Sequence, residues 1–291
     1  MPVSRRDVLR GAAAGMTWLA LGAAESMADV QSGNAPSGPR IGMCDWNLGK
    51  AGTMDVIATA RKIGLDGVEV SVNFPGPGQH LRDPAVQQEF KAVMKRESIV
   101  APSVALGILN GVPLKSEPKA AIWLDDSIDV AAALGAKLIL VAFFGDGELK
   151  MDNKQEIART VDVLKELAPH AAKAKIILGL ENTLSADDNL RLLELVGSPW
   201  VQVYYDFKNS ADYGRDIPAE IRRLGSHICQ VHVKNGGEFL SGPSNVSFPA
   251  CGEALREIGF HGWYVLETAS PTGDVVADTR ANVEYVRKHF A

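Results

Sequence analysis

Eight short apolar runs, each followed by a stretch with helical spacing, constrain the fold of this chain most strongly. The apolar runs, expected to be strands, occupy residues 40–45, 67–72, 101–106, 137–143, 176–181, 201–206, 228–233 and 263–267. The helical stretches occupy residues 53–63, 84–97, 118–134, 154–174, 186–196, 216–224, 249–258 and 277–289. Strands that alternate with helices indicate a parallel sheet covered by helices. Eight such units in about 250 residues predict a single (β/α)8 TIM barrel of the α/β class.

Local chemistry marks several of the expected helix boundaries. Asp83 precedes Pro84, which places an N-cap residue ahead of a proline at the first helical position. Gly64 and Gly135 follow the last turns of two helices, where the backbone often becomes left-handed. The stretch 154–174 carries an apolar stripe that predicts its strand-facing side: Ile157, Val161, Leu164, Leu167 and Ala171.

A doubly wound open sheet is the alternative architecture for this alternation. Such a sheet more often carries a glycine-rich turn after its first strand, and residues 42–50 are only a misspaced version of a phosphate loop. The sequence has no GxGxxG motif outside the N-terminal segment, no nucleophile elbow and no HExxH motif. These features favour the closed barrel.

Residues 1–28 are predicted to be a twin-arginine export signal. Arg5 and Arg6 precede an apolar segment over residues 11–24, and Ser26 and Ala28 are the small residues that a signal peptidase requires. The alternatives are a membrane anchor or a disordered tail, but the segment is short and Ala- and Gly-rich for a span of roughly 30 Å. Cleavage would leave a linker over residues 29–39 and a catalytic domain over residues 40–291. We therefore expect a periplasmic or otherwise exported protein without membrane association.

The charge balance argues against a nucleic-acid partner. The chain has 30 basic and 35 acidic side chains, and removal of residues 1–28 leaves 27 and 33, a net charge of −6. Such a surface does not attract nucleic acid or anionic lipid. The cysteines Cys44, Cys229 and Cys251 are odd in number and form no CxxC pair, so we expect no disulfide framework. The oligomeric state stays open, with a homo-oligomer among the options.

Four of the apolar runs end on a side chain that can bind a metal. In a parallel barrel the carboxyl ends of all strands lie at one rim, so we expect these side chains to converge. Carboxylates and one imidazole without thiolates suit Mn²⁺ first, with Mg²⁺, Co²⁺ and Zn²⁺ as alternatives. The sequence therefore predicts one divalent ion, and its predicted ligands are Glu181, Asp206, His232 and Glu267.

This site would suit proton transfer on a small carbohydrate. Four protein ligands around a six-coordinate ion leave two positions for oxygens of a polyol or hydroxy-ketone. Glu181 and Glu267 come from strands that a closed barrel sets apart across its mouth, so one could remove a proton and the other return it to the opposite face. Acid–base catalysis of this kind contributes about 10²–10⁴-fold. We predict that both act as catalytic residues of a sugar isomerase or epimerase.

Further residues at the same rim are predicted to contact the substrate. Trp46 could stack on a sugar ring or pack within the barrel. Lys234 could stabilise an enolate or bridge acidic neighbours, and His80 follows a loop rich in Pro and Gly that could reach the substrate or face solvent. The predicted substrate-binding residues are Trp46, His80, Asn110, Asn182, Asn209 and Lys234.

The motifs around the predicted ligands resemble a known family. The segments LEN, YYD, VHVKN and VLET carry Glu, Asp, His and Glu in that order. They are similar to the xylose isomerase-like barrels, and within these to the sugar phosphate isomerase/epimerase superfamily, which includes ketose 3-epimerases and AP endonuclease 2-like barrels. The resemblance covers residues 40–290. It implies that the four residues hold a divalent ion and that Glu181 and Glu267 form the proton-transfer pair.

Two departures from the ketose epimerases bear on the substrate. Those enzymes place a substrate-binding His three residues after the metal-binding Asp, where this chain has Asn209, and an Arg six residues after the metal-binding His, where it has Glu238. The usual hexulose contacts are therefore not carried over. Exported members of the same superfamily cleave 3-keto-glycosides by β-elimination, which starts with the same metal-assisted proton abstraction next to a carbonyl. A 3-keto-glycoside lyase or hydratase therefore stays open, as does a non-catalytic sugar-binding barrel.

Overall fold

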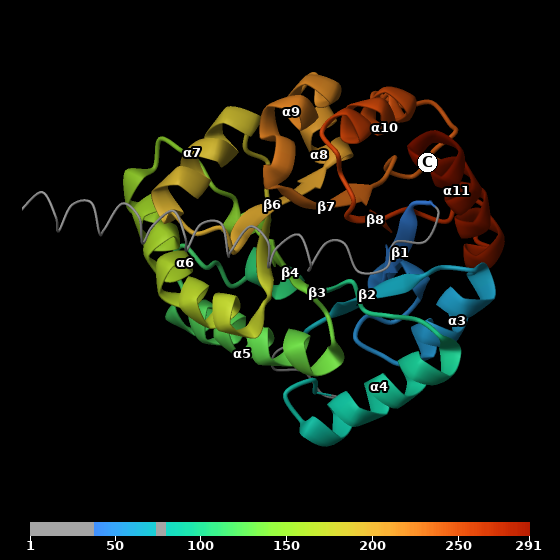
Figure 1. The fold of residues 1–291 in the computed structure, drawn as a ribbon, viewed down its shortest axis with the longest axis horizontal. Helices are drawn as coiled ribbons and strands as arrows, with labels where there is room; N and C mark the ends of the chain where they lie inside the picture. The colour runs from blue at the N-terminus through green and yellow to red at the C-terminus, as the bar shows by residue number, and fades with distance from the viewer. Residues whose placement is uncertain (1–37, 74–79) are drawn as a thin grey trace, which may run out of the picture. The chain divides into compact units, whose positions relative to one another are not determined.

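The computed structural model describes residues 38–73 and 80–291, in which eight strands close into a barrel (Figure 1). The strands are β1 (Arg40–Cys44), β2 (Gly67–Ser71), β3 (Ser103–Leu106), β4 (Leu138–Ala142), β5 (Ile177–Glu181), β6 (Val201–Asp206), β7 (Ile228–Val233) and β8 (Trp263–Leu266). Each strand pairs in parallel with the next, and β8 pairs with β1. The predicted single (β/α)8 barrel is confirmed.

Helices that follow the strands form a ring around the barrel (Figure 1). They are α3 (Asp55–Ile63), α4 (Pro84–Glu97), α5 (Pro118–Leu134), α6 (Lys154–Ala174), α7 (Ala186–Val196), α9 (Ile217–Leu224), α10 (Phe248–Glu257) and α11 (Val275–Phe290). Each contacts the next, and α11 contacts α3, so the ring is closed. The predicted apolar stripe of α6 is buried against the strands. The Asp83 side chain caps α4 by accepting a hydrogen bond from the Ala85 N–H at 2.8 Å.

Two short helices were not predicted by apolar periodicity. They are α2 (Asp45–Leu48) and α8 (Phe207–Asp212), which follow β1 and β6 directly. Four and six residues are too few for a helical stripe to be recognised. Short 3-10 turns also occur at Gly107–Asn110, Gly145–Gly147 and Gly225–His227. The other helix and strand boundaries differ from the predicted ones by at most two residues.

A register shift between β6 and β7 aligns two residues of the barrel mouth. The pairing moves by one residue between Val203 and Tyr204, which leaves one extra residue in β7. Beyond the shift, Asp206 lies opposite His232. Because successive strand residues point to opposite faces, a one-residue shift decides which side chains face the barrel interior.

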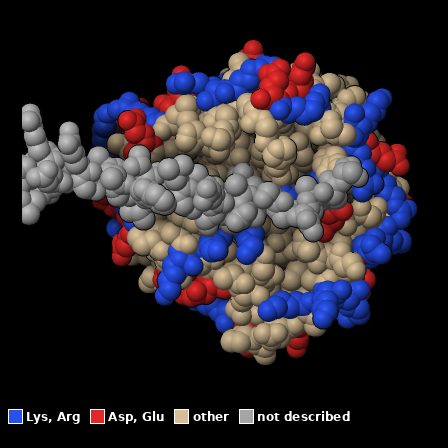
Figure 2. Space-filling view, in the orientation of Figure 1, with Lys and Arg blue, Asp and Glu red and all other residues tan. Residues whose placement is uncertain are grey.

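Further sequence predictions concern the N-terminal segment, membrane association, the cysteines and the surface charge. The predicted export signal and residues 29–37 of the predicted linker lie outside the described residues. Among the described helices, none combines the length and apolarity needed to cross a bilayer. Cys44, Cys229 and Cys251 are buried and carry free thiols. On the face shown in Figure 2, acidic and basic side chains are interspersed around the periphery.

Candidate metal centre in the barrel mouth

The four predicted ligands meet at the carboxyl ends of the last four strands. Glu181 and Asp206 are the final residues of β5 and β6, His232 is the penultimate residue of β7, and Glu267 follows β8 directly. One ligand atom from each residue lies within 4.8 Å of the others. The barrel closure thus brings together side chains that are far apart in the sequence.

The imidazole of His232 is at the centre of this group. Its Nδ1 atom lies 2.9 Å from Glu181 Oε1 and 3.5 Å from Glu267 Oε2. The same nitrogen lies 3.8 Å from Asp206 Oδ2. Nitrogen and oxygen atoms bound to one ion at about 2.0–2.2 Å lie roughly 3–4 Å from one another. The spacing of the four side chains therefore suits a single ion between them.

Asp206 carries the clearest sign that the group fits a cation. Its Oδ1 atom accepts a hydrogen bond from the Asn209 N–H at 2.7 Å, which caps α8. Its buried Oδ2 atom accepts no hydrogen bond within the described part of the chain, although the Lys234 ammonium lies 3.1 Å away as an ion-pair partner. A buried acceptor that lacks a hydrogen bond costs about 1–3 kcal/mol. A divalent ion beside Oδ2 would offset that cost.

Lys234 supplies positive charge at the edge of the group. Its Nζ atom lies 2.7 Å from Glu267 Oε2 as well as 3.1 Å from Asp206 Oδ2. Burial on its own would lower the pKa of Lys234, but the charges of Asp206 and Glu267 outweigh burial and raise it. Lys234 therefore stays protonated and bridges its acidic neighbours, which is one of the two roles expected from the sequence.

The carboxyl groups of the site have different proton affinities. Burial raises the pKa of Glu181 to about 7, and it also raises the pKa of Asp206. Burial acts on Glu267 in the same direction, but the charges of His232 and Lys234 outweigh it, so the pKa of Glu267 lies below its ordinary value. A bound dication would lower the pKa values of all three acids.

A cavity of about 580 Å³ opens beside the metal-capable residues. Its lining from β1–β4 and the segments after them is uncharged and consists of Trp46, Ser71, Asn73, Ala105, Gly107, Ile108, Asn110, Leu140, Ala142 and Phe144. The second half of the barrel contributes Glu181, Asn209, Lys234 and Glu267. Small-molecule sites in proteins have this size and this mixture of apolar walls with a few polar groups.

Four of the six predicted substrate-binding residues line the cavity. Trp46 does so and also lies beside Glu267, where its side chain contributes to lowering the pKa of that carboxyl. The Asn209 amide lies 3.4 Å from Glu181 Oε1, to which it donates. Asn110 accepts a hydrogen bond from the Phe144 N–H at 3.0 Å. The remaining one of the four is Lys234.

The other two predicted substrate-binding residues, His80 and Asn182, do not line the cavity. Asn182 donates to Asn189 Oδ1 at 2.9 Å and accepts from the Leu184 N–H at 2.8 Å, so it shapes the turn before α7. The Nδ1 atom of His80 accepts a hydrogen bond from the Arg82 N–H at 3.1 Å, ahead of α4. Short-range bonds to the backbone thus engage both side chains, and their contact with a substrate stays a prediction.

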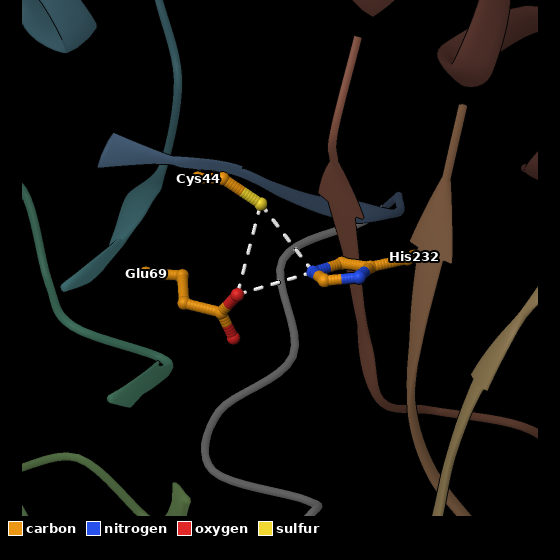
Figure 3. Close-up of side chains that lie close together, drawn as sticks. All are labelled: Cys44, Glu69 and His232. Carbon is orange, nitrogen blue, oxygen red and sulfur yellow. Dashed lines mark hydrogen bonds and ion pairs between the residues drawn. The ribbon is translucent and has the colours of Figure 1, made fainter. Parts of the chain in front are cut away.

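The sequence interpretation missed a second group beneath the mouth (Figure 3). Glu69 of β2 is fully buried, and its Oε1 atom lies 3.1 Å from His232 Nε2. Cys44 Sγ lies 3.3 Å from the same nitrogen. Burial raises the pKa of the Cys44 thiol well above its usual range, which keeps it protonated. The available signal was a carboxylate between Val68 and Val70 in the middle of an apolar strand.

Comparison with known proteins places the chain among relatives with this architecture. The family described as xylose isomerase-like TIM barrel matches residues 57–289. The chain belongs to this family. The family resemblance expected from the four strand-end motifs is confirmed.

Individual relatives of this xylose isomerase-like barrel include sugar epimerases. L-Ribulose-5-phosphate 3-epimerase UlaE of Escherichia coli (strain SMS-3-5 / SECEC) is 28% identical over 258 residues, which cover 82% of this chain and 90% of the relative. The 2-epi-5-epi-valiolone 7-phosphate 2-epimerase of Actinoplanes sp. is 28% identical over 201 residues, which cover 68% and 73%. The solved structure of D-allulose 3-epimerase from Methylomonas sp. with D-allulose has the same fold, with a TM-score of 0.71, 19% identity and coverage of 88% and 98%.

Proposed function

We propose that this xylose isomerase-like barrel is a divalent-metal-dependent sugar isomerase or epimerase. It would move a proton on a carbon next to a carbonyl or hydroxyl group. The observation that carries this proposal is the convergence of four metal-capable side chains beside a cavity that two of them, Glu181 and Glu267, also line. The relatives named as epimerases of sugar phosphates and related compounds support the same class of reaction.

The proposed metal ligands are the four strand-end residues, with His232 binding through Nδ1. A bound ion would polarise a carbonyl oxygen and stabilise negative charge that develops there. Mn²⁺ is proposed first because three of the four ligands are hard carboxylate oxygens, with Mg²⁺, Co²⁺ and Zn²⁺ as alternatives. The ligands are Glu181, Asp206, His232 and Glu267.

Proton transfer is assigned to the two glutamates of the cavity. Glu181 and Glu267 stand at the ends of β5 and β8, which are not neighbours in the barrel. One would remove a proton from the substrate carbon and the other would deliver a proton to the opposite face, which inverts the configuration. The Lys234 ammonium, 2.7 Å from Glu267, would stabilise an adjacent oxyanion. Trp46, which lies beside Glu267 and lines the same cavity, would help to orient it.

Hydrogen exchange with solvent tests this function directly. The Mn²⁺-loaded protein is incubated in deuterated water with free ketoses and with their phosphates, and deuterium at the carbon next to the carbonyl is followed by NMR. We expect metal-dependent exchange that is lost in Glu267→Gln and retained in Glu238→Gln, which alters an exposed carboxylate. Sugar binding without exchange in the loaded protein would instead indicate a non-catalytic sugar-binding barrel.

A second candidate is a 3-keto-glycoside lyase or hydratase. The cavity offers an apolar wall of Ile108, Leu140 and Phe144, which suits the aglycone of a glycoside better than a chain of hydroxyl groups. Asn209 and Glu238 also differ from the residues that contact a hexulose in ketose epimerases, and Glu238 is exposed. Both candidates share the first proton abstraction. Release of free aglycone from a 3-keto-glycoside would favour the lyase, and exchange without release would favour the epimerase.

We also propose that the protein is exported through its twin-arginine segment. Arg5 and Arg6 support this because paired arginines ahead of a short apolar segment are read by that export route. Replacement of both residues by Lys should retain the precursor in the cytoplasm. Cell fractionation followed by immunoblotting measures this, and unchanged export of the double variant would contradict the proposed localisation.

A further inference from the structure

The imidazole of His232 is engaged at both of its nitrogens. Nδ1 faces the barrel mouth, 2.9 Å from Glu181 Oε1. Nε2 faces the barrel interior, where Figure 3 shows Glu69 and Cys44 directed at it. A histidine can bind a metal through Nδ1 only when that nitrogen carries no proton, and the neutral ring then holds its proton on Nε2. The partner of Nε2 therefore influences the metal centre.

The carboxylate of Glu69 is equipped to accept that proton in a hydrogen bond. Its Oε2 atom accepts from Ser103 Oγ at 2.5 Å and from the Tyr204 hydroxyl at 3.0 Å. Its Oε1 atom lies 3.1 Å from His232 Nε2. The Tyr204 ring also packs on the imidazole, with 4.4 Å between ring centroids, and so limits its rotation. All four side chains are buried, so water does not compete for these bonds.

Gln230 sets the direction of the hydrogen bonds around Glu69. Its side-chain NH₂ donates to Ser103 Oγ at 2.7 Å and to the Tyr204 hydroxyl at 3.0 Å. An amide NH₂ can only donate, so each hydroxyl accepts there and keeps its own proton for Glu69. The opposite orientation of the amide would turn both hydroxyl protons away and leave Oε2 buried without a donor. Glu69 Oε2 thus accepts two hydrogen bonds, which leaves Oε1 to face His232.

We propose that Glu69 is a positioning residue that accepts the Nε2 proton of His232 and thereby keeps Nδ1 free and aimed at the metal centre. The proposal rests on the proposed function, because it requires His232 to be a ligand. Carboxylates that accept the second ring N–H of a metal-binding histidine fix the orientation of the ring and increase its basicity. Their loss typically weakens metal binding by about 10–100-fold.

A second metal site made of Cys44, Glu69 and His232 is the competing interpretation of the same geometry. Such a site would require Cys44 as a thiolate, and its occupation together with the site at the mouth would require both nitrogens of His232 without protons. It would place this charge where all three side chains are fully buried. The hydrogen-bonded arrangement requires neither condition, and in it the Cys44 thiol can donate to Glu69 Oε1, 3.6 Å from Sγ.

Metal affinity of a near-isosteric variant tests the positioning role. Glu69→Gln keeps the side-chain volume but replaces one carboxylate oxygen by an NH₂ group. In either orientation of the amide this donor faces another donor: the Ser103 and Tyr204 hydroxyls in one, the Nε2 proton of His232 in the other. Calorimetric titration with Mn²⁺ should give a dissociation constant about 10–100-fold higher than that of the wild type. Cys44→Ser, which changes the other neighbour of Nε2, is the matched control and should stay within about threefold of the wild type. An affinity of Glu69→Gln within that same margin would overturn the proposal.

Two measurements on the wild-type protein keep the proposal testable if Glu69→Gln does not fold. In protein loaded with diamagnetic Zn²⁺, the ¹⁵N spectrum of His232 should show a proton on Nε2, and an unprotonated Nε2 would overturn the proposal. Loading with Co²⁺ should give one ion per chain without a thiolate charge-transfer band. A second ion and a thiolate band, both lost in Cys44→Ser, would establish the competing site instead. A wild type that binds no divalent ion would refute the metal centre itself, which is a different outcome from unchanged binding in Glu69→Gln.

Discussion

The two halves of the barrel contribute opposite chemistry to one cavity. In the half built on β5–β8, the four strands carry Glu181, Asp206, His232 and Glu267 at or next to their carboxyl ends. In the half built on β1–β4, the described residues that line the cavity carry no charge. One half is therefore suited to bind a cation and move protons, and the other half is suited to recognise a neutral molecule.

The first half also contains buried acids, but their bonds are satisfied within the protein. Asp45 accepts hydrogen bonds from the Gly52 N–H and the Ser71 N–H, both at 2.7 Å. Glu69 accepts from two hydroxyls through Oε2, and its Oε1 atom lies 3.1 Å from His232 Nε2. Asp206 in the second half instead keeps one buried oxygen without a hydrogen bond. Burial of a carboxylate alone therefore does not distinguish the two halves. They differ in that Asp206 Oδ2 has the Lys234 ammonium 3.1 Å away as an ion-pair partner but no hydrogen bond within the described part of the chain.

The largest expected effect on turnover comes from a substitution in the half built on β5–β8. Glu267→Gln keeps the size of the side chain but removes the charge and the proton-transfer group, so turnover should fall by about 10²–10⁴-fold. Glu238→Gln, on an exposed loop after β7, is the control and should retain activity. Steady-state kinetics on the substrate found by hydrogen exchange provides the measurement. Wild-type turnover in Glu267→Gln would contradict the assignment of proton transfer to the half built on β5–β8.

Removal of the metal should lower the free energy of unfolding, because the proposed ligands of the ion hold together the half of the barrel built on β5–β8. An ion that binds only the folded state at 100 times its dissociation constant stabilises by about 2.7 kcal/mol. The melting temperature should therefore fall by several degrees with a chelator and recover with Mn²⁺. Asp206→Asn should respond to neither treatment, because the side chain loses its charge and presents one NH₂ group. A metal response in Asp206→Asn equal to that of the wild type would place the ion elsewhere.

The uncharged half should affect substrate binding and leave metal binding intact. Phe144→Ala removes an aromatic wall of the cavity and should raise KM by about 10-fold, or about 1.4 kcal/mol. Its Mn²⁺ affinity should equal that of the wild type, since Phe144 lies in the half without the ligands. Parallel kinetics and calorimetry test both statements. A loss of Mn²⁺ affinity in Phe144→Ala would show that the two halves are not separable.

The smallest effect concerns a histidine between carboxylates on the outer helices. His170 of α6 lies 2.8 Å from Asp125 of α5, and this hydrogen bond raises the pKa of His170. The pKa of His170 is therefore higher in the folded protein than in the unfolded chain, where it is about 6.5. The hydrogen bond stabilises the fold fully below about pH 6.5 and loses this effect as the pH rises through the folded-state pKa. The pair is partly exposed, so the contribution should stay below about 1 kcal/mol.

Urea unfolding of the wild type and Asp125→Asn at acidic and alkaline pH measures the His170 contribution. The difference in unfolding free energy should shrink as pH rises. A difference that grows with pH would contradict the assignment. His170 lies on an outer helix and His232 is buried in the site. The difference between the wild type and Asp125→Asn therefore reports the pH dependence of His170 and not that of His232.

Much of the architecture was predictable because strand and helix patterns alternate cleanly. The convergence of the strand-end side chains was predictable for a related reason: a charged residue that closes an apolar run in a parallel barrel must lie at the rim. Glu181 and Glu267 both satisfy that rule. The short helix α8 was not predictable from periodicity, although Asp206 followed by Asn209 is a pattern that caps helices.

The remaining site residues depend on contacts between distant strands. Glu69 acquires its role from Ser103, Tyr204 and His232, which lie on β3, β6 and β7 and meet it only across the closed barrel. Rim position alone also did not determine which side chains line the cavity. His80 and Asn182 were predicted to contact the substrate, but they are not among the described residues that line the cavity, and each bonds to a nearby backbone group.

Anomalous diffraction from crystals grown with Mn²⁺ would locate the proposed metal ion. We expect one ion per chain, bonded to Glu181, Asp206, Glu267 and the Nδ1 atom of His232. No bound ion at saturating Mn²⁺, or an ion bonded to His232 through Nε2 between Cys44 and Glu69, would contradict it.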